Sequence, residues 1–266
     1  KKLIEEFEKK AKDPGDQWAT RVVLAGIYKN DGRYDDAIKA YEAAIAEKPK
    51  EPAAILALAQ LKSDRSDKAG ARTEYEKALP LQKISADVEQ TTRILLALCL
   101  DTKDFTAAKK YHDALVKTSG GSLFVKAELG RELMARGYYE KAESEFRDLV
   151  KAASGDNRAL APAMRDLGSS LAKQKKTKEA LEVLKKALSI AGSAAGVRSE
   201  ILLIMTDAFR AESKLPELIT ILEAEKGQDF QRVVTMGALY EETGDVEKAT
   251  ATYRKALTMD SKNIDT

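Results

Sequence analysis

The sequence predicts an all-α protein made of antiparallel helix pairs that follow one another along a solenoid. The same apolar pattern of helical period returns roughly every 35 residues, a spacing typical of helical repeat arrays. Glycine or alanine recurs at fixed places within that pattern. The chain is 44% hydrophobic but only 6% aromatic, which favours many small contacts between helices over one bulky core.

The first complete unit begins near Trp18. Its first helix has an apolar face at Leu24, Ala25 and Tyr28. Gly32 is expected to end this helix, because glycine readily adopts left-handed backbone. A second helix then places aromatic and alanine residues on one face, at Tyr34, Ala37, Tyr41 and Ala44, and ends at Pro49.

Three further copies repeat this order closely. Their matching positions are Leu129, Gly130, Leu133, Gly137, Tyr139, Ala142, Phe146 and Leu149, then Leu167, Gly168, Leu171, Ala180, Leu184 and Ala187, and finally Met236, Gly237, Tyr240, Gly244, Ala249, Tyr253 and Ala256. Weaker copies fill the gaps, with Leu58, Ala59, Ala71, Tyr75 and Ala78, then Leu95, Leu96, Ala108, His112 and Leu115, and then Met205, Thr206, Phe209 and Leu218. We therefore expect about seven repeats, which start near residues 18, 52, 89, 123, 161, 199 and 230.

The pattern resembles that of the tetratricopeptide repeat (TPR) family, in which a large apolar residue, a small one, an aromatic or leucine and a mid-repeat glycine precede an Ala–aromatic–Ala helix. The resemblance implies a right-handed α-α superhelix and a single TPR solenoid over residues 18–266. Residues 1–17 then form the second helix of a truncated preceding repeat, with Leu3, Ile4 and Phe7, and a linker at Asp13-Pro14. Asp260 to Thr266 look like the opening of a following repeat, so we expect a piece of a longer protein.

Small residues have a physical role in this pattern, because two helices pack closely only where one offers space for a large side chain of the other. The expected positions are Ala37, Ala71, Ala108, Ala142, Ala180 and Ala249. Lengthened turns between repeats are expected at Ser119-Gly120-Gly121, Ser154-Gly155-Asp156 and Gly192 to Gly196.

The sequence offers little for catalysis or metal binding. His112 is the only histidine and Cys99 the only cysteine, and both occupy positions of the repeat that elsewhere hold core residues. A zinc site built from Cys and His is therefore excluded, as is an intrachain disulfide. We expect no enzymatic activity, no cofactor, no metal site and no small-molecule substrate.

The resemblance places the partner surface on the first helix of each repeat, which lines a concave groove in the family. Arginine recurs there in three consecutive repeats, at Arg93, Arg131 and Arg165, and a guanidinium suits bidentate binding of a carboxylate. We therefore predict a basic central groove for an acidic or C-terminal segment of a partner protein. The further partner-binding residues expected in this groove are Leu100, Phe124, Met134, Lys173 and Arg210.

The favoured function is thus a scaffold for protein–protein interaction that binds a peptide or partner segment. A regulatory or assembly module of a larger multidomain protein, in signalling or envelope secretion, is the alternative. An RNA-binding array of the pentatricopeptide kind is disfavoured by a net charge of only +2, which also argues against wholesale binding to nucleic acid. No apolar run has the length of about 20 residues that a membrane span requires. For the compartment we favour the cytoplasm, with the periplasm as the alternative if a signal or anchor lies outside these residues.

Overall fold

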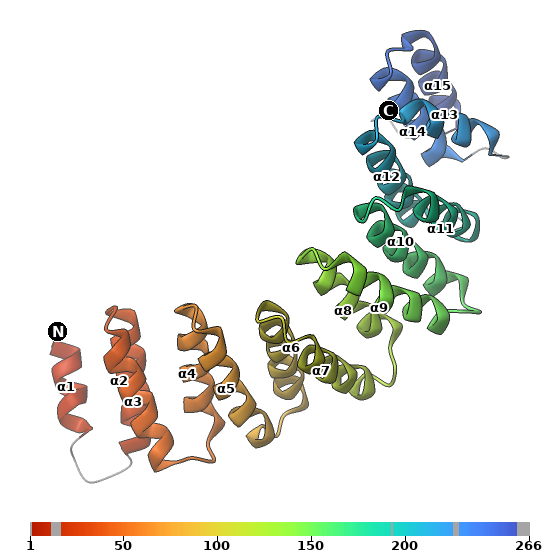
Figure 1. Cartoon of the computed structure of the whole chain (residues 1–266). Helices are drawn as coiled ribbons and strands as arrows, with labels where there is room; N and C mark the ends of the chain where they lie inside the picture. The colour runs from red at the N-terminus through yellow and green to blue at the C-terminus, as the bar shows by residue number, and fades with distance from the viewer. Residues whose placement is uncertain (1, 12–16, 193, 226–228, 260–266) are drawn as a thin grey trace. The chain divides into compact units, whose positions relative to one another are not determined.

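The computed structural model describes residues 2–11, 17–192, 194–225 and 229–259, and within these ranges the regular structure is helical throughout (Figure 1). The chain divides into two compact units, residues 1–121 and 122–266, each of which is described by itself. Asp13-Pro14 and Asp260 to Thr266, for which a linker and the opening of a repeat were expected, lie outside the described residues.

The first unit contains a single leading helix and three helix pairs (Figure 1). The leading helix α1 packs against α2. The helices of the first unit are α1 (Lys2–Lys10), α2 (Gln17–Asn30), α3 (Tyr34–Glu47), α4 (Pro52–Asp64), α5 (Lys68–Ala78), α6 (Ser85–Asp101) and α7 (Phe105–Thr118). A short 3₁₀ turn, η1 (Leu79–Leu81), follows α5.

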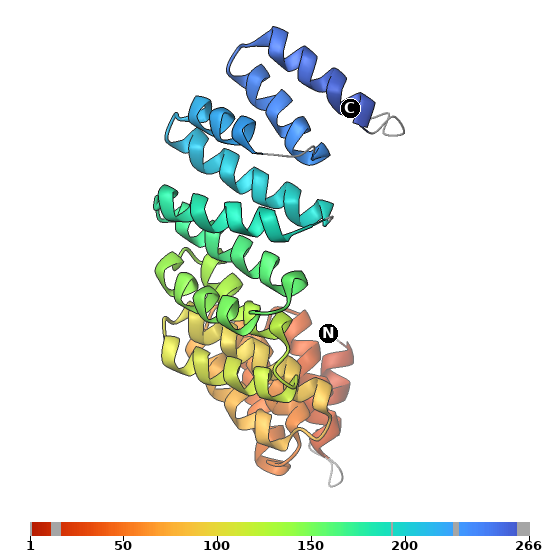
Figure 2. The same ribbon diagram turned by 90° about the vertical axis from the view of Figure 1, so that its right-hand side faces the viewer.

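The second unit contains four helix pairs, which Figure 2 shows stacked one above another. Each first helix also contacts the first helix of the next pair, from α8 to α10, α10 to α12 and α12 to α14. The helices are α8 (Leu123–Ala135), α9 (Tyr139–Ala152), α10 (Asn157–Lys173), α11 (Thr177–Ile190), α12 (Ala195–Ala211), α13 (Leu215–Ala224), α14 (Phe230–Glu242) and α15 (Val246–Met259).

Each of the seven pairs turns through one residue with left-handed backbone. Three of these residues are the expected glycines, Gly32, Gly137 and Gly244, with φ of 77°, 78° and 85°. In the other four turns the residue carries a side chain and φ lies between 58° and 63°, at Ser66, Lys103, Lys175 and Ser213. The turn geometry therefore persists where the glycine signal is missing.

Three first helices are longer than the pattern predicts. α6, α10 and α12 each contain 17 residues and begin four residues before the expected repeat starts at 89, 161 and 199. The expected lengthened turn from Gly192 to Gly196 is correspondingly shorter, because Ala195 already opens α12. Periodicity alone missed these extra turns, since their residues do not continue the apolar pattern.

The core lies between the helices of each pair and between neighbouring pairs. The six alanines expected at close helix contacts are all buried, with at most 5% of their surface exposed. Large side chains one helical turn further along the same second helices are also buried, as for Phe146 and Leu184. His112 and Cys99 are buried too, in agreement with their predicted place in the core.

Candidate functional site

The second unit presents two hollows on its first helices α10, α12 and α14. The first hollow lies between α10 and α12 and has a volume of about 320 Å³. Its lining consists of small and apolar residues with a polar rim: Ser169, Ala172, Lys173, Lys175, Thr177, Ile204, Asp207, Ala208, Ala211 and Glu212.

The second hollow lies one step further along the same surface, between α12 and α14. Its volume is about 300 Å³ and its lining is Ser199, Leu203, Thr206, Arg210, Gln231, Val234, Thr235, Ala238, Leu239 and Glu242. Leu203 is 60% exposed, which is high for a large apolar side chain. The two hollows therefore offer adjacent apolar surface separated only by α12.

The periodicity of α12 explains how one helix serves both the core and the hollows. Leu202, Met205 and Phe209 point into the core and are almost fully buried. Residues on the other face, such as Leu203 and Asp207, remain open to solvent. In an α-helix, residues three and four positions apart lie on the same face, so the order of apolar and polar residues in the sequence produces this division.

The predicted residues Arg131 and Arg165 lie in the second unit and share one carboxylate. Asp166 accepts a hydrogen bond from Arg131 Nε at 3.0 Å and another from Arg165 Nη2 at 2.6 Å. Its side chain is only 11% exposed. Arg165 also forms an ion pair with Glu200 on the next first helix, α12. Two cations and two anions are thus combined in one network, which leaves little uncompensated positive charge there.

Asp166 and Glu200 were not anticipated as part of this surface. Arg131 and Asp166 are 35 residues apart in sequence, as are Arg165 and Glu200. This separation is close to the length of one repeat, which is a sequence signal that marks both acidic residues as candidate partners without deciding between them and other carboxylates. The predicted basic groove rested on the arginines alone.

Arg93 belongs to the first unit, where it forms an ion pair with Glu89 of the same helix at 2.8 Å. Leu100, which we predicted as an apolar contact for the partner, is fully buried in α6. That prediction is wrong, because a side chain with no exposed surface belongs to the core and cannot contact a ligand. The error arose because α6 is apolar around its last turn, where Leu98 and Cys99 are buried as well.

Phe124 and Met134 both lie on α8, the first helix of the second unit. Phe124 is 68% exposed, and the guanidinium of Arg131 lies 5.8 Å from the centre of its ring. Met134 is half-buried. This part of α8 therefore offers an exposed aromatic ring beside a paired cation.

Lys173 and Arg210 line the first and the second hollow, respectively. Arg210 donates to both carboxylate oxygens of Glu242, at 2.7 and 2.8 Å, and to Asp207 at 2.7 Å. These hydrogen bonds lower the pKa of Glu242. Arg210 is therefore occupied by neighbouring carboxylates, whereas Lys173 is exposed at the rim of the first hollow.

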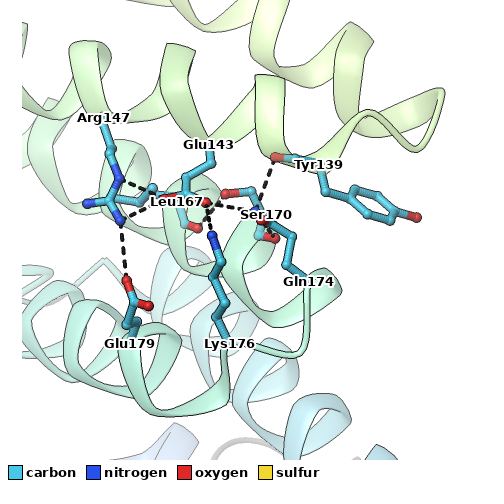
Figure 3. Close-up of polar contacts among 8 residues, drawn as sticks. All are labelled: Tyr139, Glu143, Arg147, Leu167, Ser170, Gln174, Lys176 and Glu179. Carbon is cyan, nitrogen blue, oxygen red and sulfur yellow. Dashed lines mark hydrogen bonds and ion pairs between the residues drawn. The ribbon is translucent and has the colours of Figure 1, made fainter.

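A further polar cluster, centred on Glu143, joins the first helix pair of the second unit, α8 and α9, to the second pair, α10 and α11 (Figure 3). Its carboxylate accepts hydrogen bonds from Arg147 Nε at 2.8 Å, Lys176 Nζ at 2.8 Å and Gln174 Nε2 at 2.9 Å. Burial favours the neutral acid, but these three donors outweigh it and lower the pKa of Glu143 to about 2. The Gln174 amide also donates to the backbone oxygens of Tyr139 and of Ser170, so this cluster connects neighbouring repeats rather than forming a reactive site.

Family models described as tetratricopeptide repeat match residues 18–61, 128–195 and 233–263, together more than half of the chain. The chain belongs to the TPR family. TPR arrays are typically non-enzymatic scaffolds for interaction with proteins, and the general scaffold role applies to this chain. A search of curated protein sequences finds no match.

Solved structures resemble this TPR chain at low sequence identity. The structure of Naa15/Naa10 bound to HypK-THB has a TM-score of 0.54 and 15% identity, over 97% of this chain and 40% of that chain. YrrB, a TPR protein with an unusual peptide-binding site, has a TM-score of 0.45 and 18% identity, over 79% of this chain and 99% of that chain. A TPR protein from Parabacteroides merdae ATCC 43184 has a TM-score of 0.45 and 14% identity, over 94% of this chain and 95% of that one. At such identities the likeness concerns the fold alone.

Two features are absent from the part of this TPR chain that the structure describes. None of its helices combines the length and the apolar character needed to cross a bilayer. The same residues contain no group of three or more His, Cys, Asp or Glu side chains arranged to hold a metal ion.

Proposed function

We propose that this TPR chain binds an extended peptide segment of a partner protein along α10, α12 and α14. The observation that carries the proposal is the pair of apolar hollows on these three first helices. Apolar surface lost from water on binding would supply the main driving force, at roughly 25 cal/mol per Å². The polar rim would fix the orientation of the segment.

The separation of the hollows suggests the spacing of the residues that fill them. Packed helices have axes about 8 to 10 Å apart, and an extended segment in the polyproline II conformation advances about 3.1 Å per residue, with every third side chain on the same side. Adjacent hollows on successive first helices would therefore accept apolar side chains about three positions apart. Leu203, which is exposed beside the second hollow, would pack against the segment as it crosses α12.

Ion pairs with neighbouring carboxylates neutralise much of the positive charge of the basic groove that we predicted from the sequence. A partner carboxylate at Arg131 or Arg165 would have to compete with Asp166 and Glu200, which already bind these guanidinium groups. Carboxylate binding at the three predicted arginines, including Arg93, thus stays a prediction. The apolar hollows carry the proposal instead.

Filling each hollow with a large side chain tests the proposal. Peptides would be selected from a phage-displayed random library on the full chain, and their affinity measured by fluorescence anisotropy. Ala211 lines the first hollow and Ala238 the second, and both are exposed, so Ala211→Trp and Ala238→Trp should fold normally. We expect each to weaken binding about tenfold or more, which corresponds to about 1.4 kcal/mol or more.

A matched variant separates this effect from a general effect of tryptophan. Ala152 is exposed at the end of α9, outside both hollows, so Ala152→Trp should leave the affinity unchanged. Circular dichroism would verify that the three variants melt alike. Peptides that bind Ala211→Trp and Ala238→Trp as tightly as the parent would disprove binding in the hollows.

A further inference from the structure

From the charges around the first hollow, we infer that the bound segment carries an acidic side chain next to the apolar residue in that hollow. The inference rests on the proposed function, because it assigns a chemical character to the same peptide. The acidic group would be held by Lys173 and Lys175, which line the hollow between α10 and α12. An apolar residue about three positions away would occupy the second hollow, by the spacing derived above.

The carboxylates of the first hollow already have partners. Asp207 accepts from Arg210 at 2.7 Å. Glu212 accepts from Lys214 at 2.7 Å and from the hydroxyl of Thr177. These hydrogen bonds lower the pKa of Glu212, and the nearby positive charge of Lys175 lowers it further. The acidic part of the rim is thus already engaged by groups of the chain itself.

The two lysines differ from the other cations of this surface. Across the described ranges, neither Lys173 nor Lys175 forms an ion pair within 4.0 Å, and both are exposed. Arg131, Arg165 and Arg210, in contrast, each bind at least one carboxylate of a neighbouring helix. The positive charge that remains for a ligand therefore gathers at the end of α10 and in the turn after it.

The second hollow has no such excess of positive charge. Its only basic lining residue is Arg210, which binds both oxygens of Glu242. An apolar or neutral side chain therefore suits the second hollow, and an acidic one suits the first. A lysine ammonium binds a carboxylate as a point charge and tolerates several approach directions, so an aspartate or a glutamate would serve equally.

A charge-reversal experiment with a matched control tests the inference. The peptides selected on the full chain would be measured against Lys173→Glu/Lys175→Glu and against Lys178→Glu. Lys178 is an exposed lysine in the first turn of α11 and does not line the hollow. Displayed peptides that are fused at their C-terminal end have no free terminal carboxylate, so any acidic preference would reflect side chains.

We expect the selected peptides to contain aspartate or glutamate beside an apolar residue. The double reversal should weaken their binding about tenfold or more, while Lys178→Glu leaves it nearly unchanged. Replacing the acidic residue of the peptide by its amide should weaken binding to the parent by a similar factor. The same replacement should have little further effect on the double variant, because the two changes remove one interaction.

Two outcomes would overturn the inference in different ways. If the peptides lack acidic residues, or bind the double reversal as tightly as the parent, yet still fail to bind Ala211→Trp, the acidic preference is wrong and the groove remains the binding site. If binding is insensitive to both tryptophan variants, the groove itself is wrong and the inference fails with it.

Discussion

Three glycines in first helices show how single residues set the distance between paired helices. A Cβ atom added to Gly130 would lie 2.5 Å from the ring of Phe146, and one added to Gly168 would lie 2.4 Å from Leu184. Gly237 has the same relation to Tyr253, at 2.6 Å. Small residues therefore lie on both helices of a pair. The predicted alanines are those of the second helices, and these glycines are those of the first helices.

Substitution of Gly130 by alanine should be destabilising, although alanine is the better helix former. The Phe146 ring is buried and has little room to move, so overpacking should lower the free energy of unfolding by about 1 to 3 kcal/mol. Gly26 provides the control, because a Cβ there would meet no atom within 4 Å. Gly26→Ala should instead raise the stability by about 0.5 to 1 kcal/mol in urea denaturation. Equal stability of the two variants would contradict the close contact at Gly130.

Contacts between helices connect repeats through polar groups as well as through the core. Residues 31 to 35 positions apart form many of these contacts, for example Lys29 with Asp64, Arg198 with Asp229 and Lys176 with Glu143. The helices and their apolar faces could be predicted from the sequence, because both depend on local periodicity. The ion pairs could not, since a charged residue on a helix surface has several possible partners until neighbouring helices are in place.

The Glu143 cluster in Figure 3 gives a test of such a contact. The pKa of Glu143 in the folded state, about 2, lies below the ordinary value of 4.5, so the ionised Glu143 carboxylate stabilises the fold above about pH 4.5. That contribution is lost as the pH falls from about 4.5 towards 2. Glu143→Gln should therefore lower the stability by about 1 to 3 kcal/mol at neutral pH, and the difference from the parent should shrink over this acidic range.

Glu182→Gln is the matched control for that experiment. Glu182 is exposed on α11, so its replacement should change the stability only slightly at any pH. Urea denaturation of the parent and both variants at several pH values would provide the comparison. A stability difference for Glu143→Gln that stays constant down to pH 2 would show that the carboxylate charge is not responsible.

At the scale of the whole molecule, helix contacts occur between neighbours along the chain, within a pair or between adjacent pairs. In such a repeat array, stability is approximately a sum over repeats and their nearest-neighbour contacts. A local defect should therefore spread over a few helices and spare distant ones. The partition into two compact units supports this expectation.

Ala180→Glu should make this behaviour visible. Ala180 is 1% exposed in α11, so the substitution overpacks a helix contact and buries an unpaired charge, at a cost on the order of 1 to 5 kcal/mol. Hydrogen exchange should accelerate in α10, α11 and α12, while α2 to α5 of the first unit retain their protection. Uniform acceleration throughout the chain would indicate one cooperative unit instead.

The sequence by itself determined the helix pairs, the approximate repeat starts, the buried small residues and the general role of the chain as a scaffold, because each depends on a local pattern of spacing. Only the tertiary structure decided which of the predicted partner-binding residues are exposed and which already have a charged partner. It placed Leu100 in the core, joined Arg131 and Arg165 to Asp166, and left Lys173 beside an apolar hollow. The physical reason is that exposure and ion pairing depend on how one helix pair lies against the next, over about 35 residues of sequence.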